Sequence, residues 1–269
     1  MDHLADRSSR LEIGSGARSE ARERPRFDTR PGTGALAASA VALGLFPLIR
    51  PFFPLDVFST SILEAAAGPV ASPAWLLSHL MAMLAFVALP FGVLALGDRV
   101  AAAGEGAAAR RAAWWSLGGV GLVLPAFGVE SFALPLIGRA YLDGRADVEA
   151  LVAPIYRGPM TLVLLVGLAM LAVGAFGLAG AIRRTGVLPG WAAVVFALGL
   201  ALWCPIFPRA VRVLDGLLIG TGGAALALGL WRGFRSPRAS APGATARASW
   251  DRSGTPAEPS AAWIREILS

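Results

Sequence analysis

The stretch WWSLGGVGLVLPAFGVESFALPLIG, from Trp114 to Gly138, decides the fold class. Its length suits a transmembrane helix, because about 20 predominantly apolar residues cross the hydrocarbon core of a bilayer. The stretch carries one acid, Glu130, in otherwise apolar surroundings. Because a carboxylate is unfavourable inside a membrane, we expect Glu130 to be paired, kept neutral or used in function.

The composition of the whole chain also indicates an integral membrane protein. The 269 residues are 55% hydrophobic and 16% charged, and the mean hydropathy is +0.61. A soluble domain of this length does not need so much apolar surface. All 24 basic residues are Arg, while Lys, Asn and Gln are absent, a bias typical of GC-rich bacterial genomes. We therefore expect an all-α helical bundle in the bacterial cytoplasmic (inner) membrane.

Several function classes are disfavoured by the residue types present. The high pI comes from Arg residues in tails and loops, whereas a nucleic-acid-binding protein needs a basic folded face with interleaved aromatic residues. Cys204 is the single cysteine, so neither an intrachain disulfide nor a cysteine-based metal cluster can form. With His3 and His79 as the two histidines, the membrane part of one chain cannot hold a bis-histidine haem. Nucleotide-binding and serine-nucleophile motifs are missing. We predict no cofactor, no metal and no nucleic-acid partner.

Hydropathy predicts six membrane spans. The polar region before the first span is too long for the n-region of a signal peptide. The first apolar run is therefore expected to be an uncleaved transmembrane helix. The last residues form a candidate amphipathic helix, which either docks on the membrane surface or is a frayed terminus. We predict a disordered tail over 1–33, a membrane domain over 34–232 and a flexible tail over 233–269 containing the candidate helix 260–268. The spans are expected at 34–54, 75–96, 113–138, 159–182, 189–207 and 210–231.

An even number of spans places both termini on the same side of the membrane. Arg residues favour the cytoplasm for that side, because cytoplasmic segments are enriched in basic residues. Tryptophans favour the membrane interfaces, and they fall near the predicted span ends. Trp114, Trp115, Trp191 and Trp231 are expected at the inner interface, and Trp75 and Trp203 at or near the outer one.

Two local patterns predict further structure. Residues 55–68, in the first outer loop, are predicted to form a short helix that lies on the membrane surface and ends at Gly68. Gly216 and Gly220 form a GxxxG pattern, which allows close helix packing. Packing inside one bundle is the favoured interpretation of this pattern, ahead of a dimer interface.

Polar residues of the spans gather in the predicted outer halves. At about 1.5 Å per residue, Glu130 lies roughly 10 Å below the outer end of its span. His79 lies about one turn inside its span from the same side, and Arg212 and Asp215 occupy the first turns of the last span. The inner halves are mostly Ala, Leu, Val and Gly. This distribution predicts an outward-facing, partly hydrated vestibule around Glu130.

Each of these candidates has a structural and a functional interpretation. Glu130 is a proton or cation site, or else a partner of Arg212 or a hydrogen-bonded neutral acid. His79 is a proton partner or metal ligand, or an interfacial polar residue. Asp215 is expected to pair with Arg212 or Arg209, or to cap the start of the last span, and Arg50 is expected to extend toward the interface. His79, Glu130 and Asp215 have the ligand types of a zinc site, but no spacing motif supports one.

The leading functional hypothesis is a non-enzymatic protein that transports or binds a ligand. In it, Glu130 accepts a proton or cation, Arg212 supplies a counter-charge or anion contact, and His79 titrates. One alternative is an intramembrane enzyme or redox partner, linked to a metal or a quinone. A second is a structural or accessory subunit. The expected partners are the lipid bilayer, a small-molecule or ion substrate, and a second copy or another subunit of a membrane complex.

Overall fold

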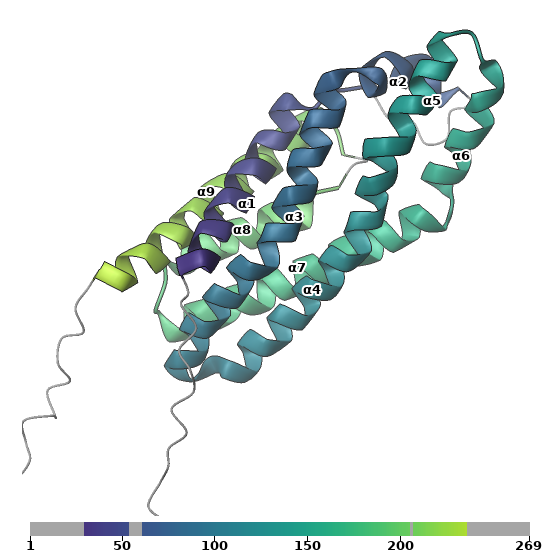
Figure 1. Ribbon diagram of the computed structural model, residues 1–269. Helices are drawn as coiled ribbons and strands as arrows, with labels where there is room; N and C mark the ends of the chain where they lie inside the picture. The colour runs from purple at the N-terminus through teal and green to yellow at the C-terminus, as the bar shows by residue number, and fades with distance from the viewer. Residues whose placement is uncertain (1–29, 54–60, 205–206, 236–269) are drawn as a thin grey trace, which may run out of the picture.

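The computed structural model describes residues 30–53, 61–204 and 207–235, which are almost entirely helical and contain no strand. The predicted all-α class is therefore confirmed for this part of the chain. Most of both predicted tails, including the candidate helix 260–268, lies outside the described residues. The helices form an elongated bundle (Figure 1). Its elements are α1 (Arg30–Ile49), α2 (Ile62–Ala71), α3 (Pro73–Val100), η1 (Ala101–Glu105), α4 (Gly106–Gly128), η2 (Val129–Ala133), α5 (Leu134–Leu142), η3 (Ala146–Val148), α6 (Glu149–Arg157), α7 (Pro159–Thr185), α8 (Gly190–Leu202) and α9 (Arg209–Arg235).

Long apolar helices make this chain an integral membrane protein. In the described residues, four helical segments are long and apolar enough to cross a membrane, and α2 and α8 are shorter apolar helices. Many large apolar side chains point outward along the bundle, as expected for a lipid-facing surface; Leu77, Leu84, Phe91 and Leu162 are examples. The four segments are Arg30–Ile49, Pro73–Leu142, Ala146–Thr185 and Arg209–Gly233.

The longest of these segments folds back on itself at Gly104. This glycine has a φ of 99°, a conformation that side-chain-bearing residues rarely adopt, and it separates α3 from α4. As a result α3 and α4 lie antiparallel and side by side (Figure 1). The start of α1, the end of α9 and the turn at Gly104 all lie at one end of the bundle (Figure 1).

An ion pair ties the turn at Gly104 to the end of α7. Arg184 Nε and Nη2 donate to the two carboxylate oxygens of Glu105 at 2.7 and 3.1 Å. This hydrogen bond, with the nearby positive charge, holds the pKa of the Glu105 carboxyl below its usual value. Because both side chains are well exposed to solvent, the pair contributes little to stability.

Glycines set the closest helix contacts. A Cβ on Gly119 of α4 would lie 2.7 Å from the carbonyl oxygen of Gly167 on α7, so neither position can carry a side chain without a shift. A Cβ on Gly216 of α9 would lie 2.8 Å from the carbonyl oxygen of Gly44 on α1. The GxxxG pattern of α9 therefore packs against α1 inside the bundle, in agreement with the favoured interpretation of the sequence.

At the opposite end, α2, α5 and α6 form a cap with its own hydrophobic cluster (Figure 1). The Glu149 carboxylate, at the start of α6, accepts hydrogen bonds from the first backbone N–H groups of α2, at 2.8 Å from Ile62 and 3.2 Å from Leu63. The expected end of this helix at Gly68 is wrong, because α2 continues to Ala71. It ends where Ser72 adopts an extended conformation (ψ 150°), which the following proline favours.

Other helix limits differ from the hydropathy prediction. The first helix begins at Arg30, inside the predicted tail, and α4 continues through η2 and α5 to Leu142. The helix predicted for residues 189–207 ends at Leu202, and Trp203 has a non-helical ψ of 82°. Pro205 and Pro208 follow, and neither has the N–H group that a continuing helix needs.

Candidate functional site

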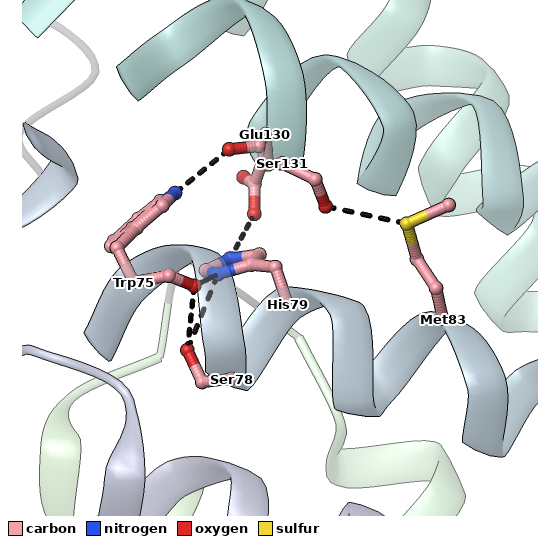
Figure 2. Close-up of polar contacts among 6 residues, drawn as sticks. All are labelled: Trp75, Ser78, His79, Met83, Glu130 and Ser131. Carbon is pink, nitrogen blue, oxygen red and sulfur yellow. Dashed lines mark hydrogen bonds and ion pairs between the residues drawn. The ribbon is translucent and has the colours of Figure 1, made fainter. Parts of the chain in front are cut away.

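Two titratable side chains of the predicted site, His79 and Glu130, contact each other. His79 Nε2 lies 2.9 Å from Glu130 Oε2, and the His79 side chain is completely buried. His79 comes from α3 and Glu130 from η2, so the contact joins two antiparallel helices near the cap (Figure 2). We call this contact the His79–Glu130 pair.

A π-helical turn orients Glu130. Residues 129–133 form η2, in which the N–H of Leu134 donates to the carbonyl of Val129, five residues earlier. Pro135 explains the wider turn, because its ring would clash with a carbonyl of a regular α-helix. Glu130 and the adjacent Ser131 are both buried on the inner side, and Ser131 Oγ donates to Met83 Sδ at 3.3 Å (Figure 2).

Hydrogen bonds fix the protonation of the imidazole. His79 Nδ1 lies 2.7 Å from the carbonyl oxygen of Trp75, and a carbonyl can only accept, so Nδ1 must donate. Nε2 and Oε2 then share one proton, carried either by nitrogen as an imidazolium facing a carboxylate or by oxygen as a carboxylic acid facing a neutral imidazole. Without that proton, two lone pairs would face each other at 2.9 Å. A hydrogen bond between Nε2 and Oε2 therefore needs one proton between these two atoms.

Aromatic rings enclose the imidazole. The Trp75 ring stacks on it with a centroid distance of 4.2 Å, Phe46 approaches edge-on at 5.3 Å, and Phe127 lies at 5.7 Å. Trp75 Nε1 also donates to the backbone carbonyl of Glu130 at 2.8 Å (Figure 2). Trp203 extends the cluster by stacking on Phe127 at 5.4 Å. Trp75 and Trp203 are thus buried parts of the site rather than side chains that face lipid.

Two arginines bring positive charge to the same region. The guanidinium of Arg50, just after α1, lies 4.4 Å from the Trp75 ring centroid, and that of Arg212, on α9, lies 5.7 Å from the Phe46 centroid. Both interact electrostatically with Glu130. Arg50 was expected to extend toward the interface, but it folds over Trp75 instead, because the indole face and the Glu130 charge attract a cation.

The Arg50 guanidinium has one unsatisfied group. Its Nε is buried and has no hydrogen-bond partner among the described residues. A buried donor without an acceptor is unfavourable by about 1–3 kcal/mol, so this nitrogen is a place where an additional acceptor would be stabilised.

A small cavity separates Glu130 from Arg212. Its volume is about 10 Å³, on the order of the room that one water molecule needs. Glu130 and Arg212 supply its polar surface, and the remaining lining is apolar. The lining residues are Phe46, Ala126, Phe127, Glu130, Leu164, Trp203 and Arg212.

The predicted residues fall into two groups. Glu130 and Arg212 line the cavity, and His79 contacts Glu130. Asp215, one turn further along α9, is 1% exposed and interacts electrostatically with Arg212. Its Oδ1 has no hydrogen-bond partner within the described chain. No group of three His, Cys, Asp or Glu residues in the described ranges is arranged to hold a metal, so His79, Glu130 and Asp215 do not form the zinc site considered from the sequence.

Sequence reasoning missed three members of the site: Arg50, Trp75 and Trp203. One signal was available, because Trp75 precedes His79 by four residues and therefore lies on the same face of the helix. No comparable signal existed for Arg50, whose side chain could reach the interface or the bundle interior from the same backbone position. No protein-family model, curated protein or solved structure matches the chain.

Proposed function

We propose that the chain is a six-span, transporter-like protein of the bacterial cytoplasmic membrane that takes up and releases a proton at the His79–Glu130 pair. Both termini would be cytoplasmic and the site would face the outside. The observation that carries this proposal is the 2.9 Å contact between Nε2 and Oε2 while Nδ1 is committed to the Trp75 carbonyl. A hydrogen bond with this geometry needs one shared proton, and both side chains are largely buried.

The six-span topology is supported by the alternating directions of α1, α3, α4, α7, α8 and α9 (Figure 1). At about 1.5 Å per residue, the 13 residues of α8 extend only about 20 Å, against about 30 Å of hydrocarbon. After α8 ends, the chain continues toward the outer side as non-helical backbone at Trp203, and this residue is buried in protein. Such irregular backbone occurs at membrane depth where protein or a cavity surrounds it, and interrupted spans often form substrate sites in transporters.

The depth of the site supports its accessibility from the outer side. Trp114 and Trp115 are exposed on α4, as interfacial anchors are, and we place the inner interface there. Glu130 lies about 23 Å further along the helix, and hence roughly 7 Å below the outer limit of a hydrocarbon layer about 30 Å thick. The cap formed by α2, α5 and α6 lies beyond that limit, over the site.

Proton release would change the structure of the pair. When the shared proton leaves for water on the outer side, Nε2 and Oε2 repel each other, and the carboxylate then carries a full charge. The nearest compensating charges are those of Arg50 and Arg212. We therefore expect Glu130 to turn from His79 toward the arginines, which would loosen the contact between α3 and η2.

Difference infrared spectroscopy on the purified protein tests this proposal. We expect the carboxyl bands of Glu130 to change with pH and to disappear in Glu130→Gln, as a carboxylic-acid band if oxygen carries the shared proton or as a shift of the carboxylate band if nitrogen carries it. Glu64→Gln, which changes an exposed acid on α2, is the matched control and should leave the band unchanged. A folded Glu130→Gln protein with the same titrating bands as the wild type would show that Glu130 does not exchange a proton.

A structural or accessory role is the second candidate, favoured by the small volume of the cavity and by the hydrogen bonds on both imidazole nitrogens. In that case the pair only fixes the register of α3 against η2. A stoichiometric partner that copurifies, together with full tolerance of Glu130→Gln, would support this role and contradict the transporter proposal.

A further inference from the structure

We propose that the protein binds the headgroup of an anionic phospholipid on the surface along which α4 and α7 meet. Arg111 and Trp115 of α4 lie on one side of this line and Gly177 of α7 on the other, and we call these three residues the α4–α7 seat. The ligand is a phosphate diester without a cationic group, as in phosphatidylglycerol. The inference concerns a lipid-facing surface and does not depend on proton exchange at the His79–Glu130 pair.

The packing of α4 against α7 fixes which faces of the two helices adjoin. The helices lie side by side (Figure 1). A Cβ on Gly118 of α4 would lie 2.5 Å from Met170 Cε on α7, and a Cβ on Gly167 of α7 would lie 2.9 Å from Leu122 Cβ on α4. Along these contacts the residue number rises on α4 as it falls on α7, so the two helices are antiparallel.

The same two faces carry the α4–α7 seat. Arg111 precedes Gly118 by seven residues, and Gly177 follows Met170 by seven, which is about two helical turns in each case. Because the helices are antiparallel, Arg111 and Gly177 stand at the same level, and both are exposed. A Cβ on Gly177 would have no atom of another described helix within 4 Å. The surface beside Arg111 is therefore open.

Arg111 has hydrogen-bond donors available for a phosphate. Its guanidinium makes no hydrogen bond within the described chain. Glu105, the acid with which it interacts electrostatically, accepts hydrogen bonds from Arg184 on both carboxylate oxygens, at 2.7 and 3.1 Å. A guanidinium matches a phosphate in shape and in charge, because two of its N–H groups can donate to two oxygens. A phosphate beside Arg111 would therefore gain a charge-assisted contact.

The side chains next to Arg111 indicate that this phosphate belongs to a lipid. Trp115 lies one turn away on the same helix face and is 44% exposed, next to Trp114 at 74%. Indole rings favour the level of the headgroups in a bilayer. Toward the middle of the bundle the surface continues with exposed apolar side chains such as Leu117 and Val173. A phospholipid can use the arginine, the indole and the apolar surface together, whereas a free ion uses the arginine alone.

The charge of the α4–α7 seat favours an anionic headgroup over a zwitterionic one. Phosphatidylcholine carries the same phosphate as phosphatidylglycerol, but with a quaternary ammonium group close to it. Arg110 and Arg111 are adjacent and both exposed, so their positive charge repels that ammonium group. Each basic residue near a bilayer surface adds to the attraction for anionic lipid. The seat therefore selects its lipid by the charge of the headgroup.

Native mass spectrometry of the purified full-length protein in neutral detergent, titrated with phosphatidylglycerol or phosphatidylcholine, tests the inference. The first phosphatidylglycerol should bind at least about fivefold more tightly than phosphatidylcholine, which is the factor typical of one arginine at an anionic membrane surface. Arg111→Gln should remove this preference. Gly177→Leu should weaken phosphatidylglycerol binding to the same extent, because its side chain fills the open surface beside Arg111.

Two matched variants separate the α4–α7 seat from general effects of charge and volume. Arg110→Gln removes the neighbouring exposed arginine, whose Nη1 lies 3.6 Å from the position of a Cβ on Gly106 and thus back along its own helix. Gly121→Leu adds the same side chain to an exposed glycine of α4 that also has open space around it. Both variants should keep the preference for phosphatidylglycerol.

Four results would overturn the inference. Equal affinity of the wild type for the two phospholipids would mean that headgroup charge is not recognised. Equal losses in Arg110→Gln and Arg111→Gln would indicate diffuse attraction by surface charge. Displacement of phosphatidylglycerol by excess inorganic phosphate would show a site for a free anion. Unchanged binding in both Arg111→Gln and Gly177→Leu would place the lipid elsewhere. The infrared titration of Glu130 is independent of all four results and tests the proton function by itself.

Discussion

Replacement of His79 by phenylalanine tests whether the His79–Glu130 pair stabilises the bundle. A phenyl ring keeps the packing against Trp75, Phe46 and Phe127, whose centroids lie 4.2 to 5.7 Å from the imidazole. The substitution removes the contact to Glu130 Oε2. The Glu130 side chain, which is only 11% exposed, then loses its hydrogen-bond partner. The change therefore isolates the polar contact from the packing.

The expected loss follows from the burial of Glu130. Removal of one partner from a buried charge pair destabilises proteins by about 3–5 kcal/mol. Glu130 can reduce this loss by binding a proton, which leaves a buried neutral acid with a penalty of about 1–3 kcal/mol. We therefore expect His79→Phe to lower the free energy of unfolding by about 3 kcal/mol at neutral pH. The loss should be smaller in acid, where protonation of the carboxyl requires less free energy.

Denaturant unfolding in mild detergent, followed by tryptophan fluorescence, measures this free energy. The double variant His79→Phe/Glu130→Leu removes the orphaned carboxyl as well, so it should recover most of the loss. Glu130→Gln should lower stability by less than about 1 kcal/mol, because its amide can still donate to Nε2. A cost below about 0.5 kcal/mol for His79→Phe, or a double variant no more stable than the single one, would refute the reasoning, since such values are typical of surface substitutions.

Three further predictions concern the scaffold. Gly119→Ala should lower the free energy of unfolding by about 1–3 kcal/mol, because its Cβ would lie 2.7 Å from a carbonyl oxygen of α7. Gly121→Ala is the control and should not be destabilising, because the space around it is open. Equal unfolding midpoints of the two variants would contradict the close packing at Gly119. Glu149→Ala should destabilise the cap by about 1 kcal/mol, because two backbone N–H groups of α2 lose their acceptor. Hydrogen exchange in α2 should therefore become faster. Unchanged exchange would mean that water fully replaces the Glu149 carboxylate as the acceptor. The pKa of the Glu105 carboxyl should lie below its ordinary value of 4.5, because Arg184 hydrogen-bonds to the charged form. The bond between the two side chains is therefore formed above that pH and is lost as the pH falls through the lowered pKa. An NMR titration should show the midpoint returning toward 4.5 in Arg184→Gln, and no shift between the two proteins would contradict the ion pair.

Much of the fold followed from the sequence because lipid imposes simple rules. Long apolar runs must become helices in a bilayer, since no water is present to satisfy the backbone. Small residues at regular spacing predicted a close helix contact at Gly216, and the structure shows that its partner is α1. The rarity of acids in apolar segments singled out Glu130 as a residue that needs a partner.

The limits of the helices were harder to predict, because tertiary contacts decide them. The chain leaves α8 at Leu202 and buries Trp203 between other rings, although hydropathy continues further. Hydropathy cannot separate a residue that faces lipid from one that faces protein, since both environments are apolar.

For the site, the sequence by itself determined which side chains are unfavourable in an apolar segment and where along each helix they stand. From these positions we predict that His79, Glu130 and Arg212 share one half of the bilayer. Only the tertiary structure decided that His79 and Glu130 contact each other and that the Arg50 guanidinium lies over Trp75. The physical reason is that depth follows from position along a helix, whereas partnership depends on how the helices rotate about their axes. Packing between distant segments sets that rotation, here through the π turn of η2 and the close approach of α4 to α7.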